Sequence, residues 1–160
     1  MLPASAQRVV DAATELGLTI DVREFPEGTR TADDAARAVG VEVGQIVKSL
    51  LFSVGDRPVL ALVSGKNRLD ERALAAVASD NGGRVGRLDA DAVRAATGYA
   101  IGGVPPFGHA TPLATFVDRD LLDYAAVWAA AGTPTHVFEV SPAELVRATG
   151  ATPADLRVDA

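Results

Sequence analysis

The sequence predicts an α+β fold in which an antiparallel or mixed β-sheet is flanked by helices. Several segments carry both a start and a stop signal for a helix, and between them lie short apolar or alternating runs typical of strands. Two of these runs, residues 46–54 and 58–64, are joined by Gly55-Asp56-Arg57. That connection is too short for a crossover helix, so an antiparallel pair is favoured over a doubly wound parallel sheet.

Five helices are expected from apolar stripes and capping residues. Val9, Ala13 and Leu16 form the stripe of the first, and the others follow side chains that can accept hydrogen bonds from a first turn. In chain order the expected helices run from about residue 5 to Gly17, from Thr31 to Gly40, from Asp70 onward, from Asp89 to Gly98 and from Ser141 to Gly150, with a further helical turn at Thr152-Pro153-Ala154-Asp155.

Strands are expected between these helices. Leu18, Ile20 and Val22 alternate with polar residues, which predicts a first strand with one buried face. The other candidates are residues 46–54, 58–64, 84–88, 113–118, 121–130 and 135–140, of which 121–130 also fits a helix.

The length and composition place limits on the function. A chain of 160 residues is expected to form a single domain, 1–160, and the absence of cysteine excludes thiol nucleophiles and disulfides. No apolar run is long enough to span a bilayer, so we expect a cytoplasmic protein. The net charge of −6 argues against broad contact with a nucleic-acid backbone. Any such contact should be local, at Arg30, at Lys66 with Arg68, or at Arg84 with Arg87.

Lys48 is the most informative residue. In strand register it shares a face with Ile46, Leu50 and Phe52, so a charge stands on an apolar face. An ammonium there must be paired or line a pocket, which suggests an anionic or carbonyl-bearing ligand. The alternative is a strand-edge lysine whose ammonium reaches water.

A glycine- and proline-rich loop follows, at residues 98–109. Glycine allows close approach of the main chain to a ligand, so the N–H groups of Gly102 and Gly103 could receive an oxyanion, with Pro106 stiffening the loop. A purely structural turn is the alternative. The loop lacks the spacing of a phosphate-binding loop.

His136 is the third candidate, because it shares a strand face with Phe138 and Val140. It could line a binding pocket or be an ordinary core histidine. Two histidines and no cysteine argue against a metal site. No serine lies in a recognisable nucleophile motif, so water is the expected nucleophile if the chain is a hydrolase.

These three segments, in this order, resemble the YbaK/ProX family of aminoacyl-tRNA editing domains. The resemblance runs from about Asp21 to Leu156 and is carried by Val47-Lys48-Ser49-Leu50, by the loop with Gly102 to Pro106, and by Gly132-Thr-Pro-Thr-His136. The last run departs from the Gly-Gly-Arg-Arg-Gly pattern of the cysteine-specific branch, which argues against cysteinyl-tRNA(Pro) as substrate.

The resemblance implies a mixed, partly barrel-like sheet surrounded by helices, and a free-standing, trans-acting deacylase that hydrolyses the ester of mischarged tRNA. The substrate implied is a small amino acid esterified to tRNA(Pro) or a similar tRNA. The resemblance also implies catalytic roles for Lys48, Gly102 and Gly103. Pro106 and His136 would then bind the substrate. No cofactor, metal, membrane or DNA is expected; the partners would be the tRNA 3′ end and a synthetase. The alternative is a non-catalytic module of the same fold that recognises aminoacyl-tRNA or a synthetase.

Overall fold

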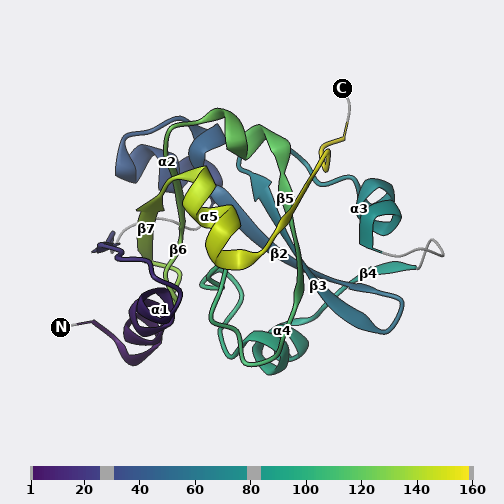
Figure 1. Cartoon of the computed structure of the whole chain (residues 1–160), viewed down its shortest axis with the longest axis horizontal. Coiled ribbons are helices and arrows are strands. Elements are labelled where there is room, and N and C mark those ends of the chain that lie inside the picture. The colour runs from purple at the N-terminus through teal and green to yellow at the C-terminus, as the bar shows by residue number, and fades with distance from the viewer. Residues whose placement is uncertain (1, 26–30, 79–83, 159–160) are drawn as a thin grey trace.

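The computed structural model describes residues 2–25, 31–78 and 84–158. Figure 1 shows the helices around the sheet strands. The helices are α1 (Ala4–Glu15), α2 (Ala32–Val39), α3 (Glu71–Ala78), α4 (Ala90–Thr97) and α5 (Pro142–Thr149), with 3-10 turns η1 (Val43–Gln45) and η2 (Arg119–Asp123). The strands are β1 (Val22–Glu24), β2 (Val47–Val54), β3 (Arg57–Ser64), β4 (Val85–Arg87), β5 (Ala114–Asp118), β6 (Val127–Ala130), β7 (His136–Val140) and β8 (Thr152–Ala154).

The strands form two sheets, which confirms the α+β prediction. The larger sheet has the order β4-β2-β3-β5-β8, and the smaller has the order β1-β7-β6. The larger sheet is mixed, because β2 pairs antiparallel with β3 and β4, whereas β5 pairs parallel with β3 and β8. The strands do not close into a barrel in the part of the chain that the structure describes.

The capping residues identified in the sequence begin the helices as predicted. The side chains of Thr31, Asp89 and Ser141 each accept a hydrogen bond from the backbone N–H three residues later. Asp70 Oδ1 accepts from the N–H groups of Arg72 and Ala73. Each bond satisfies a first-turn donor that has no partner inside its own helix.

Three predictions for the strands need correction. Thr152-Pro153-Ala154 is not a helical turn but strand β8, because it pairs parallel with Phe116–Asp118 and buries Ala154. The first strand begins at Val22 rather than Leu18. Of residues 121–130, the first three belong to η2 and the last four form strand β6, with residues 124–126 between them in neither element.

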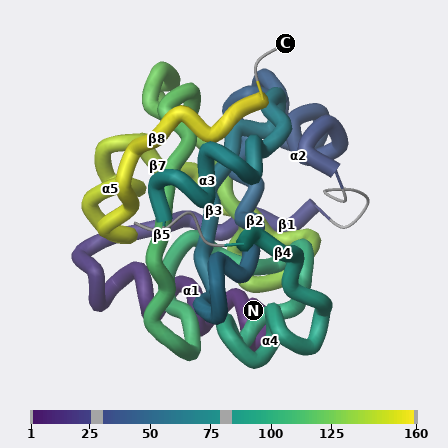
Figure 2. Tube along the Cα trace, turned by 90° about the vertical axis from the view of Figure 1, so that its right-hand side faces the viewer, coloured from purple at the N-terminus to yellow at the C-terminus, as the bar shows by residue number. Residues whose placement is uncertain are grey.

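Strand β2 is paired unequally on its two sides. β3 accompanies it from Val47 to Val54, whereas β4 covers only Phe52–Val54. Residues 47–51 have no strand partner on that second side within the described ranges, although the preceding residue Ile46 makes an isolated bridge to Trp128 of β6. Figure 2 shows β2 between β3 and β4. The uncovered edge of β2 belongs to a strand that also contacts β6 of the smaller sheet.

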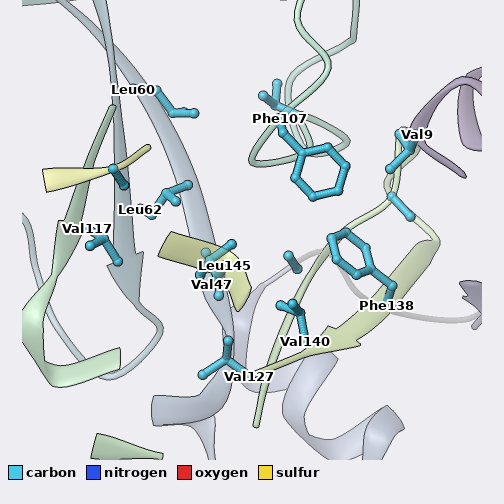
Figure 3. Packing of buried hydrophobic residues seen from close by; sticks show 14 of the residues in the cluster. Val9, Val47, Leu60, Leu62, Phe107, Val117, Val127, Phe138, Val140 and Leu145 are labelled. Carbon is cyan, nitrogen blue, oxygen red and sulfur yellow. The ribbon is translucent and has the colours of Figure 1, made fainter. Parts of the chain in front are cut away.

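The main core lies between the two sheets and includes residues from α1, α5 and the glycine-rich loop. Figure 3 shows Phe107 of that loop facing Phe138 of β7, with ring centroids 5.7 Å apart and planes tilted by 54°. Such a tilted pair adds to the free energy gained by burial alone. The loop is therefore fixed to the strand that carries His136. No helix of the described residues is long and apolar enough to cross a membrane.

We expect Leu62→Ala to lower the free energy of unfolding by about 2–5 kcal/mol, since Leu62 is fully buried on β3 and the change leaves a cavity. Leu122→Ala is the matched control, because Leu122 is 36% exposed and its truncation should cost less than about 1 kcal/mol. Denaturant unfolding of both variants measures the difference. Equal losses would contradict the position of the core.

Candidate functional site

A cavity of about 320 Å³ lies beside the unpaired edge of β2. Its wall combines residues from β2, the glycine-rich loop, β6, the turn before β7 and the first turn of α2. Most of the lining is apolar and small, with a few polar side chains. The lining residues used below are Ser49, Lys48, Gly102, Thr133, His136, Trp128, Ala32, Ala35, Ala130 and Val137.

Lys48 lines this cavity and is partly buried. Leu50 and Phe52, two and four residues further along β2, pack together in one hydrophobic cluster, as the strand alternation predicts. The ammonium donates a hydrogen bond to the backbone carbonyl of Asn67 at 2.5 Å. Burial lowers the pKa of Lys48, and the negative charge of Asp118 opposes that shift. An ammonium has three N–H donors, so two remain for a ligand.

The two glycines expected to act together have different surroundings. Gly102 lines the cavity with φ at +90°, and its N–H has no acceptor among the described residues. The N–H of Gly103 donates to the carbonyl of Ala100 at 3.0 Å, and the Gly103 carbonyl accepts from Gly132. Gly103 is also absent from the cavity wall. Of the two predicted amide donors, only Gly102 is free to bind a ligand in this structure.

Pro106 does not line the cavity that contains Lys48. It is buried and lies in the second half of the loop, next to a separate hollow that also borders Phe107 and His109. His109 Nε2 donates to the carbonyl of Pro105 at 2.7 Å, because a carbonyl can only accept. Burial lowers the pKa of His109, with the bond to Pro105 acting in the opposite direction. In this structure Pro106 therefore borders a different hollow from the one lined by Lys48, Gly102 and His136.

His136 lines the cavity and is 4% exposed. Its Nδ1 lies 2.6 Å from Thr133 Oγ1, and its Nε2 lies 3.6 Å from a carboxylate oxygen of Glu24 on the neighbouring strand β1. Both ring nitrogens therefore face polar partners, which fixes the orientation of the ring. Lys48, Gly102 and His136 come together at one cavity as the sequence suggests, although they are far apart in the chain.

Sequence reasoning missed two polar groups in the wall. Ser49 Oγ and Trp128 Nε1 are buried without a hydrogen-bond partner in the described part of the protein. A buried donor without a partner is costly, and a ligand that supplied an acceptor would remove that cost. Ser49 could have been noticed as a hydroxyl between Val47 and Leu51 on a core-facing strand; nothing local distinguishes Trp128.

Cations gather on the other side of Lys48. Lys66, Arg68 and Arg87 line a second cavity of about 450 Å³, which also has Lys48 in its wall. One expected pair, Lys66 with Arg68, and Arg87 of the other therefore border the same cavity, whereas Arg84 does not line it. Arg30 lies outside the described residues. No group of three or more His, Cys, Asp and Glu side chains suited to a metal ion occurs in the described ranges.

Comparison with known proteins identifies similar chains. The family model described as an aminoacyl-tRNA editing domain matches residues 26–148. "Uncharacterized protein YwhH" of Bacillus subtilis (strain 168) is 32% identical over 78% of each chain. "Putative Cys-tRNA(Pro)/Cys-tRNA(Cys) deacylase EbsC" of Enterococcus faecalis is 29% identical over 78% of this chain and 76% of its own. A solved structure named "Crystal structure of a putative trans-editing enzyme for prolyl tRNA synthetase" is 49% identical, with TM-score 0.93 over 99% of this chain and 100% of the other.

We expect Gly103→Ala to lower the free energy of unfolding by about 1–3 kcal/mol and to displace Thr133 in the cavity wall. The reason is that the added Cβ would lie 2.7 Å from Thr133 Cα. Gly40→Ala is the control: Gly40 has φ at +87° and open space around it, so the loss of about 1–2 kcal/mol comes from backbone conformation alone. NMR should show the Thr133 and His136 signals shifting in the first variant and not in the second. Unmoved signals in Gly103→Ala would contradict this contact.

Proposed function

Because this chain belongs to the family of aminoacyl-tRNA editing domains, we propose that it is a trans-acting deacylase of mischarged tRNA. It would hydrolyse the ester that joins a small amino acid to the 3′ end of tRNA(Pro) or a similar tRNA. The observation that carries the proposal is one cavity lined by three residues: Lys48, which is partly buried, Gly102, whose amide is free, and His136, which is buried.

In the proposed hydrolysis the protein positions the ester and a water molecule, and no side chain acts as the nucleophile. A water molecule attacks the ester carbonyl, the carbonyl oxygen becomes negative, and the bond to the ribose oxygen then breaks. The ribose oxygen takes up a proton, so the products are free amino acid and tRNA. The Gly102 N–H would stabilise the oxyanion, and Lys48 would hold the terminal phosphate or carbonyl region. The neighbouring ribose hydroxyl of the substrate would help to position the water.

The tRNA would approach from the side where the cations lie. Lys66, Arg68 and Arg87 border the second cavity next to Lys48, and phosphate contacts of this kind attract a nucleic-acid end locally. Entry of the 3′ end alone is compatible with a net charge of −6. The names of two relatives refer to tRNA(Pro) or to prolyl-tRNA synthetase, which supports that tRNA and that synthetase as the partners to test first.

The amino-acid side chain would lie against the small apolar residues of the wall. Ala32, Ala35 and Ala130 leave room for a short side chain, while His136 and Val137 limit its length. The run at residues 132–136 differs from the cysteine-specific pattern, so alanine, serine and 2-aminobutyrate are proposed before cysteine. Exclusion of the cognate amino acid, proline, would make such an activity an editing activity.

We expect Lys48→Ala to lower deacylation by at least about 10²-fold while the protein stays folded, because the variant loses a charge that contacts the ligand. Lys48→Arg should fail as well, since a planar guanidinium does not replace a compact ammonium. The measurement is release of labelled amino acid from mischarged tRNA, with circular dichroism of each variant.

Arg94→Ala is the control for this experiment, because it removes one exposed cation from α4, away from the cavity. It should keep wild-type turnover. Full activity of Lys48→Ala would refute the assignment of the site. A wild-type protein that binds mischarged tRNA without hydrolysing it would support the binding-module alternative.

We expect the wild-type protein to act on several small amino acids with graded rates, since one methylene in an apolar pocket discriminates by only about 1–3 kcal/mol. His136→Ala should extend the range toward larger side chains if the ring forms the pocket wall. A panel of tRNA(Pro) and tRNA(Ala) charged with different amino acids measures the range. Equal rates on prolyl-tRNA(Pro) and on mischarged species would contradict an editing role.

A further inference from the structure

A carboxylate is buried behind the site. Asp118 ends strand β5 and is 1% exposed. Its Oδ2 accepts hydrogen bonds from the Ser64 N–H at 3.1 Å and from Asn67 Nδ2 at 2.8 Å, and its Oδ1 accepts from the Asp120 N–H at 3.0 Å. Withdrawing a carboxylate from water is costly, and several donors are needed to offset that cost. The last residue of β3, Ser64, supplies one of them, and Asn67 in the turn that follows supplies another.

Asn67 connects this carboxylate to the site. Its side-chain nitrogen donates to Asp118 and also to Asp120 Oδ2 at 2.7 Å, so the amide is held between two carboxylates. Asp120 is itself held by Arg157 at 3.0 Å. The backbone carbonyl of Asn67 receives the Lys48 ammonium. The position of that carbonyl thus depends on side chains that do not touch the cavity containing His136.

We propose that Asn67 and Asp118 are positioning residues for Lys48: they fix the carbonyl that anchors the ammonium, and so aim its two remaining N–H groups at the ligand. This deepens the proposed function and rests on it in one respect, namely that Lys48 acts on the substrate. Neither residue is expected to touch the ester.

Charge supports the same arrangement. The other charged residues in the wall of the second cavity are Lys66, Arg68, Glu71 and Arg87, so three cations and one carboxylate border this cavity together with Lys48. Burial already lowers the pKa of Lys48. The Asp118 charge acts in the opposite direction and favours the protonated form, which is the form that can donate three hydrogen bonds. Asp120 adds a second carboxylate on the Asn67 side.

The chain makes a direct test feasible because it has only two lysines, Lys48 and Lys66. NMR of ¹³Cε-labelled lysine, assigned with a Lys66→Arg variant, follows the titration of Lys48 without any substrate. We expect Asp118→Asn to lower the pKa of Lys48 below its wild-type value. Asn67→Ala should release the turn and broaden or shift the Lys48 signal. Asp155→Asn is the control, since it neutralises an exposed carboxylate that pairs with Arg119.

Kinetics give the second readout. In both positioning variants kcat should fall on the order of 10²-fold with KM little changed, because an ångström of misplacement affects the reacting geometry more than substrate binding. After correction for uncatalysed hydrolysis, the alkaline limb of the Asp118→Asn pH profile should move down together with the Lys48 titration. Asp155→Asn should change neither.

The outcomes separate this inference from the proposed function. An unchanged Lys48 titration and unchanged kcat in Asn67→Ala and Asp118→Asn would overturn the positioning role, even in an active deacylase. Inactivity of the wild-type protein on every mischarged tRNA would refute the function, while a shifted Lys48 titration would still support the anchor. If Asp118→Asn does not fold, Asn67→Ala decides, because Asn67 is only partly buried.

Discussion

The unequal pairing of β2 is the constraint on which the site depends. β3 holds this strand along its whole length, but β4 covers only its last three residues, and the uncovered part faces the smaller sheet. A fully paired neighbour would fill the space now bordered by Lys48, Gly102 and His136. A continuous ladder would leave no room for a ligand between the strands, so this cavity depends on the interruption.

Local patterns predicted most of the elements, because their causes are local. Thr31, Asp89 and Ser141 begin helices through hydrogen bonds that reach only three residues along the chain. The β2–β3 pair follows from a short connection. The segment from Thr152 to Ala154 carries the same kind of helix-start signal but forms a strand, since pairing with β5 outweighs a local cap. No signal within the segment reveals that β5 has an available edge.

Residues of the candidate site could be predicted from the sequence where a polar side chain occupies a position at which an apolar one is expected. Lys48 and His136 stand out as polar residues on apolar strand faces. Gly103 has the same sequence context as Gly102, and only the turn to Ala100 shows that its amide is occupied. The link between Asn67 and Asp118 joins positions 51 residues apart. In the sequence each of them looks like an ordinary exposed polar residue, so their relation becomes visible only in three dimensions.

The anchoring of the glycine-rich loop bears on how a ligand would be recognised. The loop is tied to Arg8 through the Gly98 carbonyl, to Gly132 through Gly103, and to β7 through Phe107. A wall held at so many points has little conformational entropy left to lose when a ligand arrives. Complementarity must then reside in a shape that exists beforehand, and affinity is gained by preorganisation instead of by closure around the ligand. Such a rigid receptor would discriminate between ligands mainly through their dissociation rates.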